Sequence, residues 1–378
     1  MIRLKDKSIQ AFYTLLRAGL WEKEVQLLPY GDVDYGMICQ LAEEQSVTGL
    51  IAAGFDQVKD NKPPKDLALQ MIGQTLQIEQ RNKEMNQFVA SLIERMRNAG
   101  IYTLLLKGQG IAQCYERPLW RACGDVDFFL SDDNYGKAKD FLLPLASEIE
   151  PEVERSKHLG MTIHGWVVEM HGTLRCGLSR RIDKGLDEIQ NDTFYGGLVR
   201  SWMDGKTQIF LPDVTIDAVY VFTHILSHFY KGGIGLRQIC DWCRLLWAFR
   251  DKINRAELEK KVRAIGLVST WCAFGAFAVE YLGMPVEAMP LLDSKGQEVQ
   301  QFKSKADRIS KFIIKTGNFG HNRDMSYYST KPYFIRKTMS MGRRIGDMMN
   351  HFRIFPVDTL RFFPNITMNG LRSAINGE

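Results

Sequence analysis

Apolar side chains recur at helical spacing over most of the first hundred residues. The clearest stretch is 66–98, where leucine, isoleucine, methionine or phenylalanine returns every three or four positions, the period of one face of an α-helix. Ala99 and Gly100 then supply a stop signal. The pattern predicts a helical region over residues 1–99.

The pattern changes after Gly100 to short apolar runs bounded by turn residues. Such runs are typical of buried strands. A helix beginning at Asp132-Asp133 is expected between the run at 124–130 and the run at 159–163. Gly165 predicts a tight reversal between the runs at 159–163 and 166–171. We therefore expect a small mixed-sheet α/β core over 100–175, with strands at 101–106 (IYTLLL), 124–130 (GDVDFFL), 159–163 and 166–171 (WVVEMH).

Helical spacing returns after the core. It predicts a helical domain over 176–300, with helices at 217–230, 236–250 and 256–281, and then a basic region over 301–378. Prolines are expected to break up this last region, at positions 332, 356 and 364. The fold class is therefore α/β (α+β): a small mixed-sheet core with helical regions on both sides.

The charge is concentrated near the C-terminus. The chain carries 49 basic and 44 acidic residues, and the part from Lys331 onward accounts for the whole excess of +5. This tail is either a surface that faces a polyanion or a solvated face backed by core aromatics. A nucleic-acid partner is thus possible but not indicated.

Neither a signal peptide nor a membrane span is expected, because the N-terminus lacks an apolar segment and no apolar run is long enough to cross a bilayer. The seven scattered cysteines suit reduced thiols. Cys240 and Cys243 form a CxxC, but the surrounding sequence reads as helix interior. We expect a cytoplasmic protein.

Three carboxylates stand in strands of the predicted core. Residues two apart on a strand point to the same face, so Asp125 and Asp127 project together while Val126 faces the core. Two adjacent carboxylates repel each other unless a cation lies between them. Glu169 supplies a third carboxylate, and His171 shares its face. The pattern predicts a site for Mg²⁺ or Mn²⁺, with Asp125, Asp127 and Glu169 as ligands.

Cationic residues surround the predicted carboxylates in the sequence. Lys107 and Gly108 form a turn before a short helix, where backbone N–H groups can approach an anion. Arg121 lies four residues before Asp125 and is suited to bidentate phosphate contacts. We therefore expect Lys107, Gly108 and Arg121 to bind the phosphates of a nucleotide.

The segments LLLKGQGIAQCYERPLWRACGDVDFFL and VVEMH resemble the polymerase-β-like nucleotidyltransferase superfamily, and more narrowly a bacterial family of uncharacterised nucleotidyltransferases. The resemblance extends more faintly to HILSHFYKGGIGLRQICDW. It implies that Asp125 and Asp127 are the metal-binding pair, Glu169 the third carboxylate and Gly108 the glycine of the phosphate-side turn. Many members have Gly-Ser at this turn, whereas Gln109 follows Gly108 here.

The function implied is transfer of a nucleoside monophosphate from an NTP donor to a hydroxyl acceptor, which is a small molecule, an RNA or a protein. His171, His224, His228 and Asp241 are the candidates for the acceptor pocket. One alternative is a catalytically inactive nucleotide-binding or toxin–antitoxin-type module. It is favoured by Gln109, which offers no hydroxyl where many members of the family have the serine of the Gly-Ser turn. Another is a glycosyltransferase that uses the Asp-x-Asp pair, against which the Lys-Gly turn and Glu169 argue.

The carboxylate assignment leads to a mutational expectation. Asp127→Ala should abolish Mg²⁺-dependent release of pyrophosphate. It should leave the melting temperature unchanged or raised, because it relieves a pair of like charges.

Overall fold

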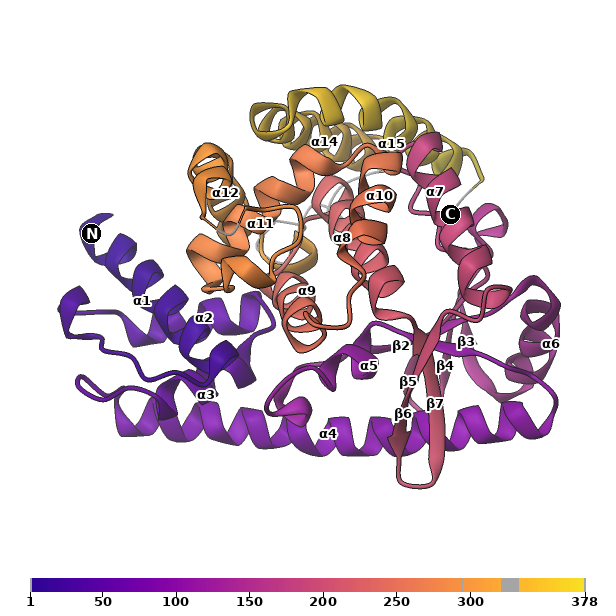
Figure 1. The fold of residues 1–378 in the computed structure, drawn as a ribbon, viewed down its shortest axis with the longest axis horizontal. Coiled ribbons are helices and arrows are strands. Elements are labelled where there is room, and N and C mark those ends of the chain that lie inside the picture. Colours follow the sequence, from indigo (N-terminus) through magenta and orange to yellow (C-terminus); the bar gives the residue numbers. More distant parts are fainter. Residues whose placement is uncertain (1, 294, 321–332, 377–378) are drawn as a thin grey trace.

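The computed structural model describes residues 2–293, 295–320 and 333–376. A five-stranded sheet lies among helices, and the long helix α4 (Lys65–Asn98) runs along one side of the molecule (Figure 1). The helix expected over 66–98 is therefore confirmed. So is the fold class, a mixed α/β core with helical regions on both sides.

The sheet has the strand order β1-β2-β5-β4-β3. β2 and β5 are parallel, and the other neighbours are antiparallel. Four of the strands match expected runs, although β1 is shorter than the run predicted at 101–106. The bounds are Leu104–Leu106 (β1), Asp125–Phe129 (β2), Ala146–Ile149 (β3), His158–Ile163 (β4) and Trp166–His171 (β5).

A two-residue turn joins β4 to β5. Ile163 pairs with Trp166, which leaves His164 and Gly165 in the turn with φ angles of 51° and 81°. Positive φ at both central residues is typical of the type I′ turns that connect antiparallel strands. The reversal predicted at Gly165 is confirmed.

The parallel pairing of β2 with β5 brings distant parts of the chain together. Between them the chain passes through α6 (Asp132–Leu142), β3 and β4. Asp127 then pairs with Glu169 and Phe129 with His171. Because side chains alternate along a strand, the acidic residues of both strands share one face of the sheet.

The opposite face of the sheet is apolar. Val126, Phe128, Val168 and Met170 are fully or almost fully buried there, in a cluster with residues of α4 such as Val89. Burial of apolar surface stabilises the fold by about 25 cal/mol per Å². This free energy favours the orientation in which the apolar face of each strand points inward. The carboxylates must then point the other way, toward the helices that follow the core.

The N-terminal helices share a core with helices from the other end of the chain. They are α1 (Ile2–Trp21), α2 (Tyr35–Glu44) and α3 (Thr48–Asp56). One apolar cluster includes residues from these helices, from the sheet and from the helices beyond residue 176. The region boundaries at 99, 175 and 300 stay a prediction, since this cluster runs across all three.

The region 176–300 is helical as expected, except for one β-hairpin. Its strands β6 (Val199–Asp204) and β7 (Thr207–Pro212) extend past α4 in Figure 1. The expectation of helix throughout this region is wrong here, because β6 alternates exposed and half-buried residues with the period of a strand. The helices are α7 (Arg180–Phe194), α8 (Val214–Lys231), α9 (Leu236–Ala248), α10 (Arg255–Ile265) and α11 (Val268–Leu282).

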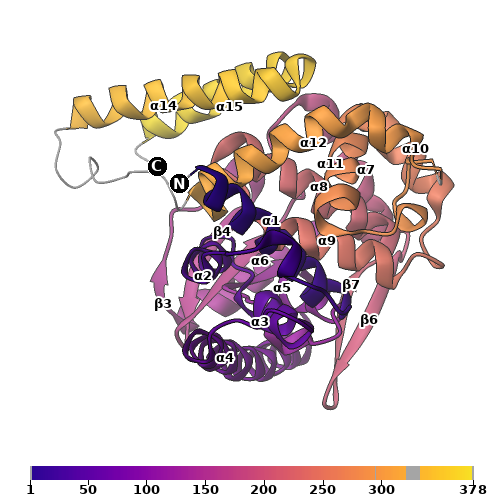
Figure 2. The ribbon, with the colours of Figure 1, turned by 90° about the vertical axis from the view of Figure 1, so that its left-hand side faces the viewer.

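After α12 (Gln297–Thr316), the chain ends in the paired helices α14 (Tyr333–Ile354) and α15 (Pro356–Asn376), side by side in Figure 2. Pro356 begins α15, where proline is well tolerated. Pro364, expected to break the tail, lies inside α15 on its exposed side, where water can satisfy the carbonyl that loses its partner. Pro332 lies outside the described residues.

Two other sequence expectations concern the tail and the cysteines. The side chains of Arg336, Lys337 and Arg344 in the basic tail lie outside what the structure describes, so neither alternative for the tail, a polyanion-facing surface or a solvated face, is tested. All seven cysteines are free, and Cys240 and Cys243 are buried in the interior of α9 as expected. None of the described helices is long and apolar enough to cross a membrane.

Candidate functional site

Three carboxylates meet on the polar face of the sheet. Asp125, Asp127 and Glu169 each place a carboxylate oxygen within 4.8 Å of the other two. Asp127 is the most enclosed, with 2% of its side chain exposed. The sequence expectation that Glu169 joins the aspartate pair is met by the parallel pairing of β2 with β5.

Lys107 binds the central carboxylate. It has a φ of 48° at the start of the short helix α5 (Gly108–Ala112), and its Nζ lies 2.9 Å from Asp127 Oδ1. Gly108 follows with a φ of 40°, and a side chain there would crowd Cys123 Sγ. These two unusual backbone conformations turn the lysine toward the sheet, so its charge already has a partner in Asp127.

The two aspartates have different electrostatic surroundings. The charge of Asp127, and then burial, raise the pKa of Asp125 above its ordinary value. Burial alone would also raise the pKa of Asp127, but Lys107 and His171 outweigh it and lower that pKa. Asp125 is therefore the carboxylate whose repulsion by Asp127, together with burial, outweighs the attraction of the nearby cations.

This contrast changes the expectation for Asp127→Ala. Repulsion between Asp125 and Asp127 alone predicts a melting temperature that is unchanged or raised. In the structure, Asp127 is also the partner of a buried lysine and of His171. Removing it leaves Lys107 without that counter-charge, so stability should fall.

Two histidines lie beside Glu169. His171 Nε2 is 2.8 Å from Asp127 Oδ1 and 3.4 Å from Glu169 Oε2, and His158 Nε2 is 3.2 Å from the same Glu169 oxygen. Burial would raise the pKa of Glu169, but the bonds from His158 and His171 lower it. His171, expected in the acceptor pocket, instead contacts the carboxylates, and His158 was not singled out by the sequence.

A cavity of about 170 Å³ opens in front of the carboxylates. Its far wall comes from α8 and α9, so residues predicted to bind phosphate and acceptor do surround one space. It is lined by Lys107, Gly108, Ile111, Arg121, Asp125, Asp127, Glu169, Val221, His224, Ile225, His228, Arg237, Gln238 and Asp241.

His224 and His228 form a pair on α8, as their spacing of four residues predicts. Their Nε2 atoms are 3.0 Å apart, a contact that requires at least one ring to be neutral. Burial, followed by the charge of Lys107, lowers the pKa of both, to about 4 for His228. The cavity wall opposite the carboxylates is therefore uncharged here at neutral pH.

Arg121, expected at the nucleotide phosphates, and Asp241, expected in the acceptor pocket, bind each other. Arg121 Nε donates to Asp241 Oδ1 at 3.0 Å, Nη2 donates to Oδ2, and the Tyr115 hydroxyl donates to Oδ1 at 2.7 Å. Both partners of the ion pair are almost fully buried. This bidentate geometry fits a carboxylate well, so the pair joins α9 to the segment that precedes β2.

Arg237 also lines the cavity, and the sequence offers two roles for it, a phosphate contact or a solvated surface charge. Its Nη1 donates to the Ala122 carbonyl at 2.9 Å, while its Nε is buried without a hydrogen-bond partner among the described residues. Burial and then the neighbouring charge of Arg121 lower its pKa. Its position four residues before Asp241, on one face of a helix, was the available signal.

Gln109 occupies the position where many similar sequences have serine. Its amide donates to Asn82 Oδ1 at 2.8 Å and contacts Met85, both on α4, and its side chain is buried. The side chain therefore points away from the cavity and helps to hold the turn in place.

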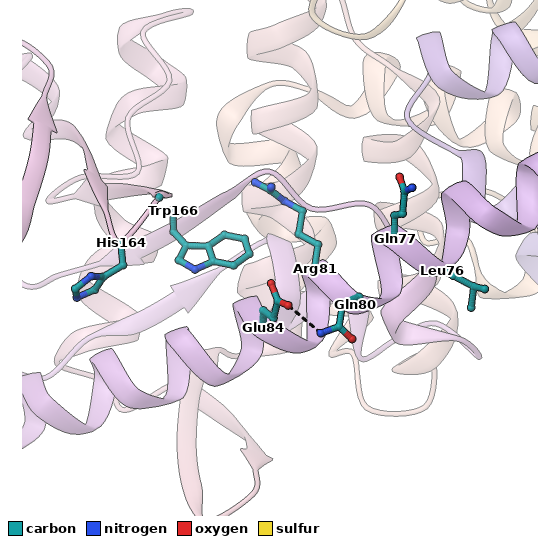
Figure 3. Close-up of a pocket in the computed structure, with 8 residues that line it drawn as sticks. Leu76, Gln77, Gln80, Arg81, Glu84, His164 and Trp166 are labelled. Carbon is teal, nitrogen blue, oxygen red and sulfur yellow. Dashed lines mark hydrogen bonds between the residues drawn. The ribbon is translucent and has the colours of Figure 1, made fainter.

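A second cavity, of about 610 Å³, lies between α4 and the turn that joins β4 to β5 (Figure 3). Arg81 lies over the ring of Trp166, 4.8 Å from its centroid. Trp166 shares its face of β5 with Val168, and Glu169 points to the other. This cavity is therefore separated from the carboxylates by the sheet.

The fold and the site together define a mixed α/β protein whose sheet carries an acidic cluster able to hold a metal ion. The chain belongs to the family described as "Uncharacterised nucleotidyltransferase", whose model matches residues 31–283. That span includes the carboxylates, Lys107 and the α8–α9 wall. No curated protein and no solved structure matches the chain.

Proposed function

We propose that this protein transfers a nucleoside monophosphate from an NTP to a hydroxyl-bearing acceptor, using Mg²⁺ or Mn²⁺ at Asp125, Asp127 and Glu169. The observation that carries the proposal is the convergence of these three carboxylates, from paired strands, in the lining of a cavity that Lys107, Arg121 and Arg237 also line. Family membership supports nucleotidyl transfer as the reaction class.

The residues present fit a hard divalent cation. Three carboxylates offer only oxygen, the ligand type that Mg²⁺ prefers, and the raised pKa of Asp125 reflects a repulsion that a cation would relieve. When bound, such ions neutralise charge on the phosphates and activate the attacking hydroxyl.

The protein's own residues have three further tasks. Lys107 fixes the orientation of Asp127, and His158 and His171 fix that of Glu169. Arg237, which lines the cavity and whose Nε has no hydrogen-bond partner among the described residues, is the residue we assign to phosphate oxygens. Arg121 holds Asp241 and thereby keeps α9 beside the Lys107–Gly108 turn.

The cavity volume limits what can lie inside. At about 170 Å³ it is smaller than the roughly 300 Å³ at which pockets begin to enclose whole ligands. It accommodates the phosphate chain and the reacting hydroxyl, while the nucleoside extends outward. The acceptor hydroxyl then approaches past His224 and His228.

The test is turnover with labelled NTP and Mg²⁺, with pyrophosphate release as the readout. Asp125→Asn and Asp127→Asn should each reduce the rate by at least about 100-fold, as loss of a charge-stabilising group does in other enzymes. Asp133→Asn, at an exposed position in the first turn of α6, is the matched control and should retain the wild-type rate. Full activity in either site variant would overturn the assignment.

A catalytically inactive nucleotide-binding or toxin–antitoxin-type module is the second candidate. It is favoured by Gln109, which contributes no hydroxyl at the turn, and by the engagement of Asp127 with Lys107. Calorimetric binding of NTP with Mg²⁺, without pyrophosphate release under any acceptor tested, would select this alternative. The glycosyltransferase alternative rests only on the Asp-Val-Asp pair, and labelled nucleotide sugars test it.

A further inference from the structure

The antiparallel pairing of β4 with β5 places two imidazoles beside one carboxylate. His158 pairs directly with His171, and their ring centroids are 4.9 Å apart. Both Nε2 atoms point at the same oxygen of Glu169, at 3.2 and 3.4 Å. Three donor atoms of these residues lie within 4.8 Å of one another.

These separations match those around a small metal ion. Metal–nitrogen and metal–oxygen distances of about 2.0–2.2 Å with tetrahedral angles place neighbouring donor atoms about 3.4 Å apart. The two measured separations from Glu169 Oε2 agree with this value. The side chains of His158, Glu169 and His171 are 30%, 27% and 13% exposed, so an ion can reach them from solvent.

We propose that His158, His171 and Glu169 form a binding site for a transition-metal ion of the Zn²⁺, Co²⁺ or Cu²⁺ class. Imidazole nitrogen suits these metals, whereas sites made only of oxygen suit Mg²⁺ and Mn²⁺. Glu169 belongs to both donor groups, but Asp125 belongs only to the oxygen group and His158 only to the imidazole group. The protein thus carries two adjoining metal positions with different preferences.

Binding requires an unprotonated Nε2 on each imidazole, since that lone pair forms the metal bond. The ion then replaces the contacts that His158 and His171 make with Glu169, and the contact of His171 with Asp127. Lys107 stays 2.9 Å from Asp127 and keeps that carboxylate paired. The exchange needs no movement of the strands, because both histidines already face the same oxygen.

The experiment titrates the metal-free full chain with Co²⁺ in the absence of nucleotide and follows its visible absorption. His158→Asn should weaken binding at least about tenfold, the lower end of the effect of perturbing a metal's surroundings. His164→Asn is the control, because His164 is exposed in the turn and its φ of 51° suits asparagine. This control should bind Co²⁺ like the wild type.

Asp125→Asn separates the two metal positions. It should leave Co²⁺ affinity within about twofold while abolishing the pyrophosphate release expected of the oxygen site. Equal affinity in His158→Asn and wild type would overturn the proposal, and so would loss of binding in Asp125→Asn as large as in His158→Asn. Intense sulfur charge-transfer bands would also overturn it, since they indicate cysteine ligands.

A readout on the unmodified protein does not depend on any variant folding. Spin-echo spectra of bound Cu²⁺ should show modulation from imidazole nitrogen, and its absence would overturn the proposal. The inference does not rest on the proposed reaction, because no nucleotide is present. A wild type that binds Co²⁺ through imidazole but releases no pyrophosphate refutes only the nucleotidyl transfer.

Discussion

Asp125 and Asp127 stand two residues apart on one strand but make opposite contributions to stability. Asp127 is enclosed and paired with Lys107 and His171, and its pKa is lowered. Asp125 is repelled by Asp127, and its pKa is raised. A carboxyl with a lowered folded-state pKa stabilises the fold above its unfolded pKa, and one with a raised pKa destabilises it there.

Substitution of the two aspartates should therefore shift stability in opposite directions. In metal-free buffer at neutral pH, Asp127→Asn should lower the free energy of unfolding by about 3 kcal/mol, because it leaves a buried lysine unpaired. Asp125→Asn should leave it unchanged or raise it. Urea denaturation measures both, and a greater loss for Asp125→Asn would contradict this account.

His171 predicts a pH dependence at the same site. Burial lowers its pKa, but Asp127 and Glu169 together raise it above the ordinary 6.5. A base with a raised folded-state pKa gives stability that is fully present below the unfolded pKa and is lost as pH rises through the folded one. Its contribution should therefore be lost as the pH rises above 6.5, through the raised pKa of the folded state.

Thermal melting in the presence of a chelator tests this dependence. Between about pH 6.5 and about pH 9, the wild type should lose more stability than His171→Asn, in which the titrating group is absent. His164→Asn, in the exposed turn, should follow the wild type. Parallel pH profiles for wild type and His171→Asn would rule out the protonated histidine as a stabilising group.

At the scale of elements, α4 supports the site from behind the sheet. Asn82 of α4 donates to the carbonyls of Leu119 and Arg121, and its Oδ1 accepts from Gln109. One buried side chain thus ties the segment before β2 to the Lys107–Gly108 turn. The helical period of 66–98 indicates that Asn82 lies on a helix, but not that two loops depend on it.

Asn82→Ala should lower the free energy of unfolding by about 2 kcal/mol, because buried polar groups lose their partners. It should also reduce turnover, since the turn and Arg121 lose a common anchor. Gln80→Ala is the control, because Gln80 is exposed and its amide donates to Glu84 on the same helix. Equal stability of the two variants, measured by urea denaturation, would refute the anchoring role.

At the scale of the whole molecule, close backbone contacts join the N-terminal helices to the core. A Cβ on Gly49 of α3 would lie 2.1 Å from the Trp120 carbonyl oxygen, which belongs to the segment leading into β2. No real contact is that short, so a side chain at position 49 must push the two segments apart. The helices before α4 are thereby coupled to the segment that leads into β2, the strand of Asp125 and Asp127.

Gly49→Ala should therefore destabilise the protein by about 1–3 kcal/mol, the usual cost of overpacking. Gly73→Ala is the matched control: Gly73 is exposed on α4, and an added Cβ there meets nothing within 4 Å among the described residues, so alanine should gain up to about 1 kcal/mol of helix propensity. Thermal melting measures both. A stabilised Gly49→Ala variant would show that α3 can move away freely.

The sequence by itself determined the elements whose signal is local. The period of 66–98 predicted α4, alternation in GDVDFFL and WVVEMH predicted β2 and β5, and Gly165 predicted the reversal. The same alternation put Asp125 and Asp127 on one face. These features depend on neighbours a few residues away, where backbone geometry fixes which side chains share a face.

Only the tertiary structure decided which distant residues meet. Glu169 lies beside Asp127 because β2 and β5 pair in parallel, and Arg121 binds Asp241 across 120 residues of chain. Lys107 pairs with Asp127 instead of remaining free for phosphate, and His158 joins Glu169 only through the register of β4 with β5. Such pairings arise from burial and strand register over the whole chain, which local periodicity does not encode.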